Sequence, residues 1–186
     1  MKARKGLNNV TKQLLNNGNK AYKRGDLDKA TDFYKKATKY DETFYLAFYQ
    51  LGVLEKKIGN SEDAIAYFNK AISIKPDFYK AWFTLGTSYE VDNNLDSAIV
   101  KYEKAIELNP GYTKAYSNLG NIHLIRKDYD IAKDILLTAI QIDPEYADAY
   151  LRLGVVYSEQ ELFEEAVEQF KISTECDLKN HDAWFR

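Results

Sequence analysis

Residues 81–89 read AWFTLGTSY, and this stretch decides the fold. Trp82, Leu85 and Tyr89 are three and four residues apart, which is the spacing of apolar residues on one face of an α-helix. Gly86 lies in the middle of that helix, where glycine costs about 1 kcal/mol relative to alanine. A single glycine of this kind could be an accident, but the same pattern recurs along the chain.

The Leu-Gly pair returns every 34 residues. It occupies residues 51–52, 85–86, 119–120 and 153–154, and Gly18 lies one period earlier. Alanine recurs in the same register, at Ala30, Ala64, Ala98, Ala132 and Ala166, and a bulky residue follows four places later, at Tyr34, Phe68, Tyr102, Leu136 and Phe170. The gapless periods are 11–44, 45–78, 79–112, 113–146 and 147–180, so the chain is a repeat protein.

Each period predicts two helices. Counting places from the first residue of a period, the first helix has its core residues at places 4, 7, 8 and 11. A break follows near place 15, at Gly25, Gly59 and Asn93-Asn94, and the second helix carries small residues at places 20 and 27. A short turn makes the two helices antiparallel. We expect the glycine and alanines to let two helix backbones approach closely, with bulky residues beside the contact, so that burial offsets the propensity cost.

The pattern resembles the tetratricopeptide repeat. The residues that carry the resemblance are Trp82-x2-Leu85-Gly86-x2-Tyr89, Ala98-x3-Tyr102 and Pro110. It covers residues 11–180, with local departures at Asn17, Ala21, Glu42, Glu55, His123 and Leu178. It implies an all-α, right-handed superhelical α-solenoid of antiparallel helix hairpins, whose inner groove is lined by the first helix of each repeat. Residues 1–10 are then an N-terminal extension, and residues 181–186 begin a truncated sixth repeat.

Composition excludes several classes of partner. Twenty-six basic and 28 acidic residues give a net charge of −2, so there is no general case for nucleic acid or for an anionic membrane. No apolar run approaches the roughly 20 residues that cross a bilayer. The single cysteine, Cys176, cannot form an internal disulfide, which fits a reducing compartment. We predict a cytoplasmic protein.

The sequence offers no catalytic constellation. His123 occupies a place that holds tyrosine in neighbouring repeats, and Cys176 occupies a place that holds Tyr40 and Ile74, so both are interpreted as core residues. No glycine-rich phosphate loop is present, and the acidic cluster 159–168 lacks a calcium-loop pattern. We therefore expect no enzyme activity, no metal and no cofactor.

The predicted binding surface is the inner groove. Places 2, 5, 6, 9, 12 and 13 of each first helix lie opposite the core places. The candidate peptide-binding residues there are Asn19, Tyr22, Tyr49, Gln50, Val53, Lys80, Phe83, Thr84, Thr87, Lys114, Asn118, Asn121 and Arg152. Lysine, amide and hydroxyl donors suit a carboxylate or an extended peptide backbone. Apolar residues on this face would be exposed to solvent without a reason unless they contact a ligand.

Two functions follow from the resemblance. The first is a non-enzymatic scaffold that binds a peptide or protein segment in the groove. The carboxylate grip of some family members is incomplete, because Leu15 and Thr84 stand where lysine and arginine are needed. The alternative is the substrate-docking region of a larger enzyme such as a glycosyltransferase, since YSNLGN (116–121) resembles groove helices of O-linked N-acetylglucosamine transferase.

The two ends of the chain differ in charge. Residues 1–44 carry eleven basic and five acidic residues, a balance of +6, whereas residues 147–180 carry three and eight, a balance of −5. A sixth repeat that stops at Arg186 would leave the last full repeat without a covering helix. We expect self-association through the C-terminal end, either around Trp184 and Phe185 or head to tail along the charge gradient.

Overall fold

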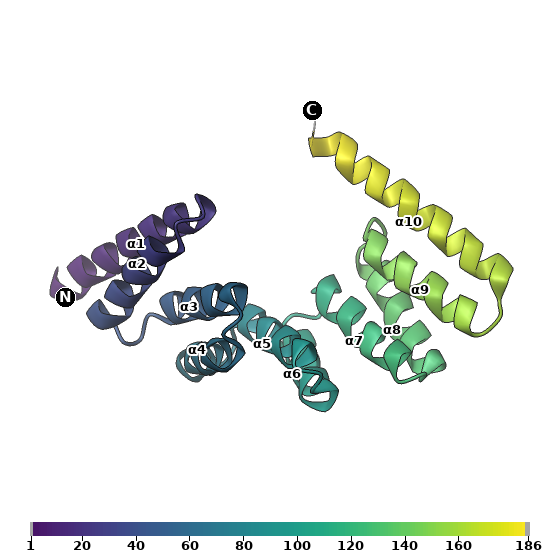
Figure 1. The fold of residues 1–186 in the computed structure, drawn as a ribbon, viewed down its shortest axis with the longest axis horizontal. Coiled ribbons are helices and arrows are strands. Elements are labelled where there is room, and N and C mark those ends of the chain that lie inside the picture. Colours follow the sequence, from purple (N-terminus) through teal and green to yellow (C-terminus); the bar gives the residue numbers. More distant parts are fainter. Residues whose placement is uncertain (1, 185–186) are drawn as a thin grey trace. The chain divides into compact units, whose positions relative to one another are not determined.

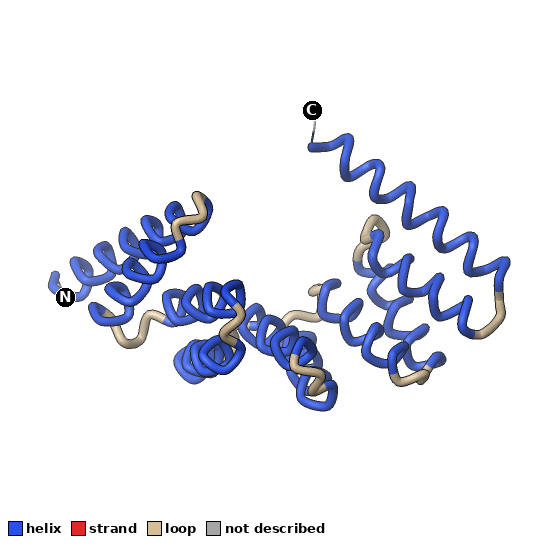
Figure 2. Tube along the Cα trace, in the orientation of Figure 1, coloured by secondary structure: helices blue, strands red, loops and turns tan. Residues whose placement is uncertain are grey.

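The computed structural model describes residues 2–184, and within that range helices joined by short loops are the only regular secondary structure (Figures 1 and 2). Its helices are α1 (Lys2–Lys23), α2 (Leu27–Tyr40), α3 (Tyr45–Ile58), α4 (Ser61–Ile74), α5 (Tyr79–Val91), α6 (Leu95–Leu108), α7 (Thr113–Ile125), α8 (Tyr129–Ile142), α9 (Ala147–Glu159) and α10 (Phe163–Trp184). The first and second helices of each 34-residue period are thus present. The predicted all-α hairpin architecture is confirmed.

The chain divides into two compact units after Ala98, and each unit is described by itself. In the first unit, α1 packs on α2 and α3 packs on α4 as hairpins (Figure 1). In the second unit, α7 packs on α8 and α9 packs on α10 in the same way. Every one of these hairpins joins two helices of one period.

All five turns inside the hairpins have one geometry. The residue at place 15 adopts positive φ each time: 80° at Gly25, 91° at Gly59, 56° at Asn93, 65° at Lys127 and 61° at Glu161. The following N–H donates to the carbonyl at place 11, as from Asn60 to Glu55 at 2.9 Å. This is the Schellman ending, in which a left-handed residue lets the last helical carbonyls be paired. Lys127 and Glu161 adopt it without being glycine, so those two turns carry no glycine signal in the sequence.

The repeated proline and the aromatic residue at place 4 are connected. The indole N–H of Trp82 donates to the carbonyl of Pro76 at 2.8 Å, and the Tyr150 hydroxyl donates to the carbonyl of Pro144 at 3.1 Å. Each bond pairs the carbonyl of the proline before a first helix with a side chain from that helix. The loop between two repeats is therefore anchored to the helix that follows it.

The place-8 glycines accommodate an aromatic ring or a leucine. A Cβ added at Gly52 would lie 2.6 Å from Cε1 of Phe68, and one at Gly154 would lie 2.6 Å from Cε1 of Phe170. At Gly120 the nearest atom is Cγ of Leu136, at 2.8 Å. The expected close approach of two backbones is thus a contact between one backbone and the place-24 side chain of the same repeat. Glycine is needed because that side chain occupies the space of its missing Cβ.

The helices at the two ends are longer than the repeat pattern predicts. α1 begins at Lys2, so it includes most of the predicted extension 1–10. α10 continues to Trp184, past the end of the fifth period, because Leu178 stands where earlier repeats have a helix-ending proline. The start of a sixth repeat at 181–186 stays a prediction, and Phe185 and Arg186 lie outside the described residues.

Buried tyrosines make the fold sensitive to alkaline pH. Tyr34 is fully buried, and burial raises the pKa of its phenol to about 12. The unfolded chain releases this proton near pH 10, whereas the folded chain keeps it longer, so stability is present below pH 10 and is lost as pH rises through about 12. We expect urea midpoints to fall over this interval, and Tyr34→Phe to flatten the fall. Equal pH slopes for the two proteins would contradict the assignment to Tyr34.

Candidate functional site

The first unit has a polar pocket between α1 and α3. Its volume is about 480 Å³, and its lining residues are Asn16, Asn19, Lys20, Tyr22, Lys23 and Gln50. All of them except Lys20 occupy predicted groove places. The structure therefore brings together three of the candidate binding residues, Asn19, Tyr22 and Gln50.

The pocket presents hydrogen-bond donors. The Tyr34 hydroxyl donates to Oδ1 of Asn19 at 2.8 Å, which leaves the amide NH₂ of Asn19 to donate elsewhere. Lys20 and Lys23 are exposed at the pocket and carry ammonium groups. Nζ of Lys57 lies 4.6 Å from the centre of the Tyr22 ring, which forms a cation–π contact with a residue of the pocket lining. Positive charge and amide donors make the pocket chemically suited to a carboxylate.

Tyr49 and Val53 are half-buried, and their role as peptide-binding residues stays a prediction. Both side chains pack against the core formed by Phe68 and its neighbours. The Tyr49 ring centre lies 5.7 Å from that of Phe68 and 5.0 Å from that of Phe78. Its burial raises the pKa of the Tyr49 phenol. These apolar residues are therefore explained by packing between repeats, and Tyr22 is likewise packed against the core around Tyr34.

Two hydrogen bonds connect α3 to α5 along the predicted groove. The hydroxyls of Tyr49 and Thr84 are 3.2 Å apart, and Nζ of Lys56 donates to the hydroxyl of Thr87. Burial lowers the pKa of Lys56. Thr84 and Thr87 thus join two first helices, and Phe83 beside them is half-buried, whereas Lys80 is exposed.

The second unit contains the other four candidate residues. Lys114 is exposed on α7, and Asn121 is half-buried on the same helix. Nδ2 of Asn118 donates to the Tyr102 hydroxyl at 3.2 Å. Nε of Arg152 donates to Oδ2 of Asp148 at 2.8 Å. The polar side chains of α7 and α9 therefore have neighbours that restrict their orientation.

Asp148 lies at groove place 2 but was not among the candidate binding residues. Its Oδ2 also accepts from the buried hydroxyl of Ser117 at 2.6 Å, so it joins α7 to α9 and holds Arg152 at once. The spacing of Asp148 and Arg152, four residues apart on a helix, was the signal that could have found this pair. The guanidinium keeps its two terminal nitrogens for another acceptor.

A second missed pattern is an aromatic residue at place 34 of four repeats, namely Phe44, Phe78, Tyr112 and Tyr146. Phe78 lies edge-on to both Tyr45 and Tyr49, with ring centres 5.0 Å apart in each case. It therefore packs the start of one first helix against the preceding first helix. The 34-residue recurrence alone was sufficient to detect it.

The remaining polar candidates have structural neighbours. Nδ1 of His123 lies 3.2 Å from Oδ2 of Asp128, and the buried Sγ of Cys176 lies 3.9 Å from the carbonyl of Pro144. Among residues 9–178, whose side chains the structure describes, no three His, Cys, Asp or Glu side chains gather as a metal site would require. In the described part of the chain, no helix combines the length and apolar character needed to span a membrane.

Two family models and several solved structures match this chain. The model of the tetratricopeptide repeat matches residues 45–78, and a second TPR repeat model matches residues 92–125 and 120–161. The crystal structure of MamA is 30% identical over 89% of this chain and 96% of that chain, with a TM-score of 0.78. The chain belongs to the tetratricopeptide repeat family. As a tetratricopeptide repeat protein, it is an α-solenoid and a protein-interaction module.

Other solved tetratricopeptide repeat structures are similar. YrrB, described as a TPR protein with an unusual peptide-binding site, is 26% identical over 88% of this chain and 84% of its own, with a TM-score of 0.69. PilF of Pseudomonas aeruginosa is 16% identical over 92% of this chain and 78% of its own, with a TM-score of 0.84, and shares the fold. No curated protein matches this tetratricopeptide repeat chain.

Proposed function

We propose that this protein is a non-enzymatic scaffold that binds an acidic segment of a partner protein along its first helices. The observation that carries the proposal is the pocket of the first unit, whose lining combines the amide and ammonium side chains of Asn16, Asn19, Lys20, Lys23 and Gln50. A carboxylate side chain or a chain terminus supplies the matching acceptors. The peptide-binding site named for YrrB, a similar protein of the same fold, supports a peptide as the ligand.

The second unit offers a similar set of donors. Lys114 is exposed, and the side chains of Asn118 and Arg152 are oriented by Tyr102 and Asp148. Donors held in place lose less side-chain entropy on binding than free ones. We propose that the same partner, or a second acidic segment of it, contacts these residues. The buried free thiol of Cys176 is consistent with a cytoplasmic location.

Two double variants test the proposed groove, with fluorescein-labelled octapeptides rich in glutamate as the probe. Lys23→Ala with Gln50→Ala removes donors from the first unit, and Lys114→Ala with Asn118→Ala removes donors from the second. Each pair should weaken binding by about 1–3 kcal/mol, because charged hydrogen bonds are lost. Fluorescence polarisation measures the dissociation constants.

The controls change charge outside the groove. Lys35→Ala removes an exposed lysine of α2 and should leave peptide affinity unchanged. A peptide in which glutamine replaces every glutamate should bind the unmodified protein much more weakly. If Lys35→Ala weakens binding as much as either double variant, the interaction is a general charge effect and the groove proposal fails.

A further inference from the structure

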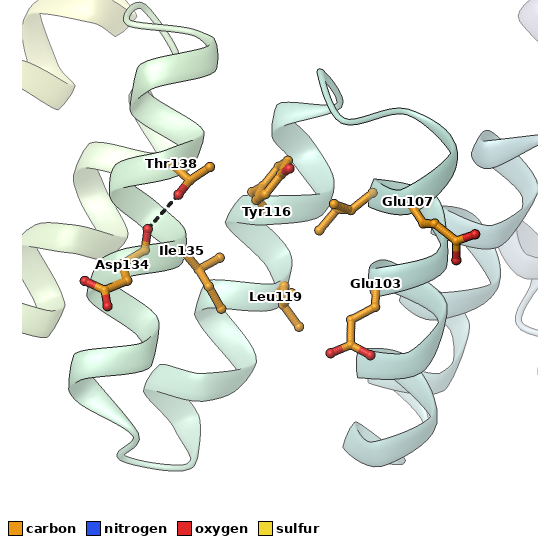
Figure 3. A pocket seen from close by; sticks show the side chains of 8 residues that line it. Glu103, Glu107, Tyr116, Leu119, Asp134, Ile135 and Thr138 are labelled. Carbon is orange, nitrogen blue, oxygen red and sulfur yellow. Dashed lines mark hydrogen bonds between the residues drawn. The ribbon is translucent and has the colours of Figure 1, made fainter.

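A second cavity lies in the second unit, on residues that are not groove places. Its volume is about 390 Å³, and α6, α7 and α8 each contribute to its walls (Figure 3). The size falls within the roughly 300–1,000 Å³ of pockets that hold ligands in proteins. No role in packing or in the proposed groove accounts for it.

The floor of the cavity is apolar and its edge is acidic. Ile106 of α6, Tyr116 and Leu119 of α7 and Ile135 of α8 form the floor. Glu103 lies on the side of α6 that faces Leu119 of α7, while the carboxylates of Glu107 and Asp134 lie farther out (Figure 3). An occupant therefore meets an apolar surface first and negative charge at its edge.

The three acids at the edge of the cavity differ in their ion-pair partners. Lys104 pairs with Glu107 at 2.7 Å along the same helix, which balances that charge. On α8, Lys133 pairs with Asp130 at 3.4 Å. Among the described residues, Glu103 and Asp134 have no ion-pair partner. The cavity thus keeps a net negative potential at its edge.

This arrangement occurs at one junction between repeats. Glu103 occupies place 25, where the other repeats have Lys35, Asn69, Leu137 and Lys171. Asp134 occupies place 22 of the following repeat, and the acid pair is completed only where the third repeat meets the fourth. At the junction of the first and second repeats the corresponding residues are Lys35 and Ala66. The acidic edge is therefore a local property and does not follow from the repeat itself.

We propose that this cavity binds an arginine side chain of a partner protein, at a site separate from the groove. The aliphatic stem of arginine would cover Ile106 and Ile135, in the way that long cationic side chains bury their methylenes. The guanidinium would lie against the Tyr116 ring and donate to the Glu103 carboxylate. Its planar form suits both contacts, stacking on an aromatic face and paired donation to a carboxylate, better than a lysine ammonium does.

The probe is N-acetyl-arginine amide, titrated into the ¹⁵N-labelled protein and followed by NMR. We expect saturable shifts of backbone amides on α6, α7 and α8 around Glu103, Tyr116 and Ile135. N-acetyl-citrulline amide has nearly the same shape without the charge and should bind at least about fivefold more weakly, because the charge-assisted hydrogen bonds are lost. N-acetyl-lysine amide should fall between the two.

The variant Glu103→Gln should weaken arginine binding by a similar factor of about five. Its matched control is Glu168→Gln, which removes an exposed acid at place 22 of the fifth repeat and should leave the affinity unchanged. Shifts spread evenly over all acidic surfaces, equal binding of citrulline, or no effect of Glu103→Gln would each overturn the proposal. The groove proposal is tested with acidic peptides, so either one can fail while the other stands.

Discussion

Phe68→Ala should lower the free energy of unfolding by about 3–5 kcal/mol, the usual cost of removing a buried aromatic side chain. Phe68 is fully buried, its ring lies against Gly52, and the Tyr49 ring packs on it with centres 5.7 Å apart. Truncation leaves a cavity that the glycine cannot fill, because glycine has no side chain to move into it. Urea unfolding followed by circular dichroism at 222 nm measures the loss.

The control for this truncation is Phe163→Ala. Phe163 is 63% exposed at the start of α10, so the same chemical change removes little buried surface. We expect a shift within about 0.5 kcal/mol, as for most surface substitutions. If both variants lose the same stability, the place-24 ring is not the centre of the hairpin core.

Gly52→Ala should destabilise the protein, although alanine is the better helix former by about 1 kcal/mol. The new Cβ would lie 2.6 Å from Cε1 and 2.7 Å from Cδ1 of Phe68, so the buried ring must shift. Overpacking of this kind costs typically 1–3 kcal/mol, which exceeds the gain in helix propensity. Gly111→Ala is the control, because its nearest neighbour would be Oδ1 of Asn109 at 3.6 Å, an ordinary contact.

A variant that combines Phe68→Ala with Gly52→Ala tests whether the Phe68 ring is the reason for glycine at position 52. In a protein that already carries Phe68→Ala, the ring is absent and Gly52→Ala meets no clash. The alanine should then stabilise the protein by up to about 1 kcal/mol, so the substitution changes sign with its partner. A loss of equal size in both backgrounds would show that the glycine is required for a reason other than the ring.

The sequence was sufficient to predict the hairpins because the evidence for them is repeated five times. One period with Asn17 in place of leucine, or with Lys127 in place of a turn glycine, is ambiguous alone, but its register comes from the other four. The same repetition explains why Lys127 and Glu161 adopt positive φ without a glycine signal. Strong packing on both sides of the turn imposes a geometry that local preference does not favour.

The candidate site was less predictable from the sequence. Helical periodicity indicates which side of a helix a residue lies on, but not how close the neighbouring helix is. It places Tyr49 and Thr84 on the groove side of α3 and α5, and the structure finds their hydroxyls 3.2 Å apart. Whether such a pair contacts a ligand or each other depends on the distance between neighbouring helices, which a period does not contain. Asp148 and Ser117 lie on different repeats, and their side chains form a 2.6 Å hydrogen bond. Residue spacing could not predict this bond, because it too depends on the distance between two helices.

The contact between the place-8 glycine and the place-24 side chain has an evolutionary consequence. Gly52 with Phe68, Gly120 with Leu136 and Gly154 with Phe170 are each encoded within a single 34-residue period. A gene duplication that copies one whole period therefore copies both halves of the contact together. The place-24 side chain also packs against the next repeat, as Leu136 does against Leu153 and Val156, so a change from ring to leucine affects that neighbour as well. Recombination between periods keeps the glycine contact intact, because both of its residues lie in one hairpin.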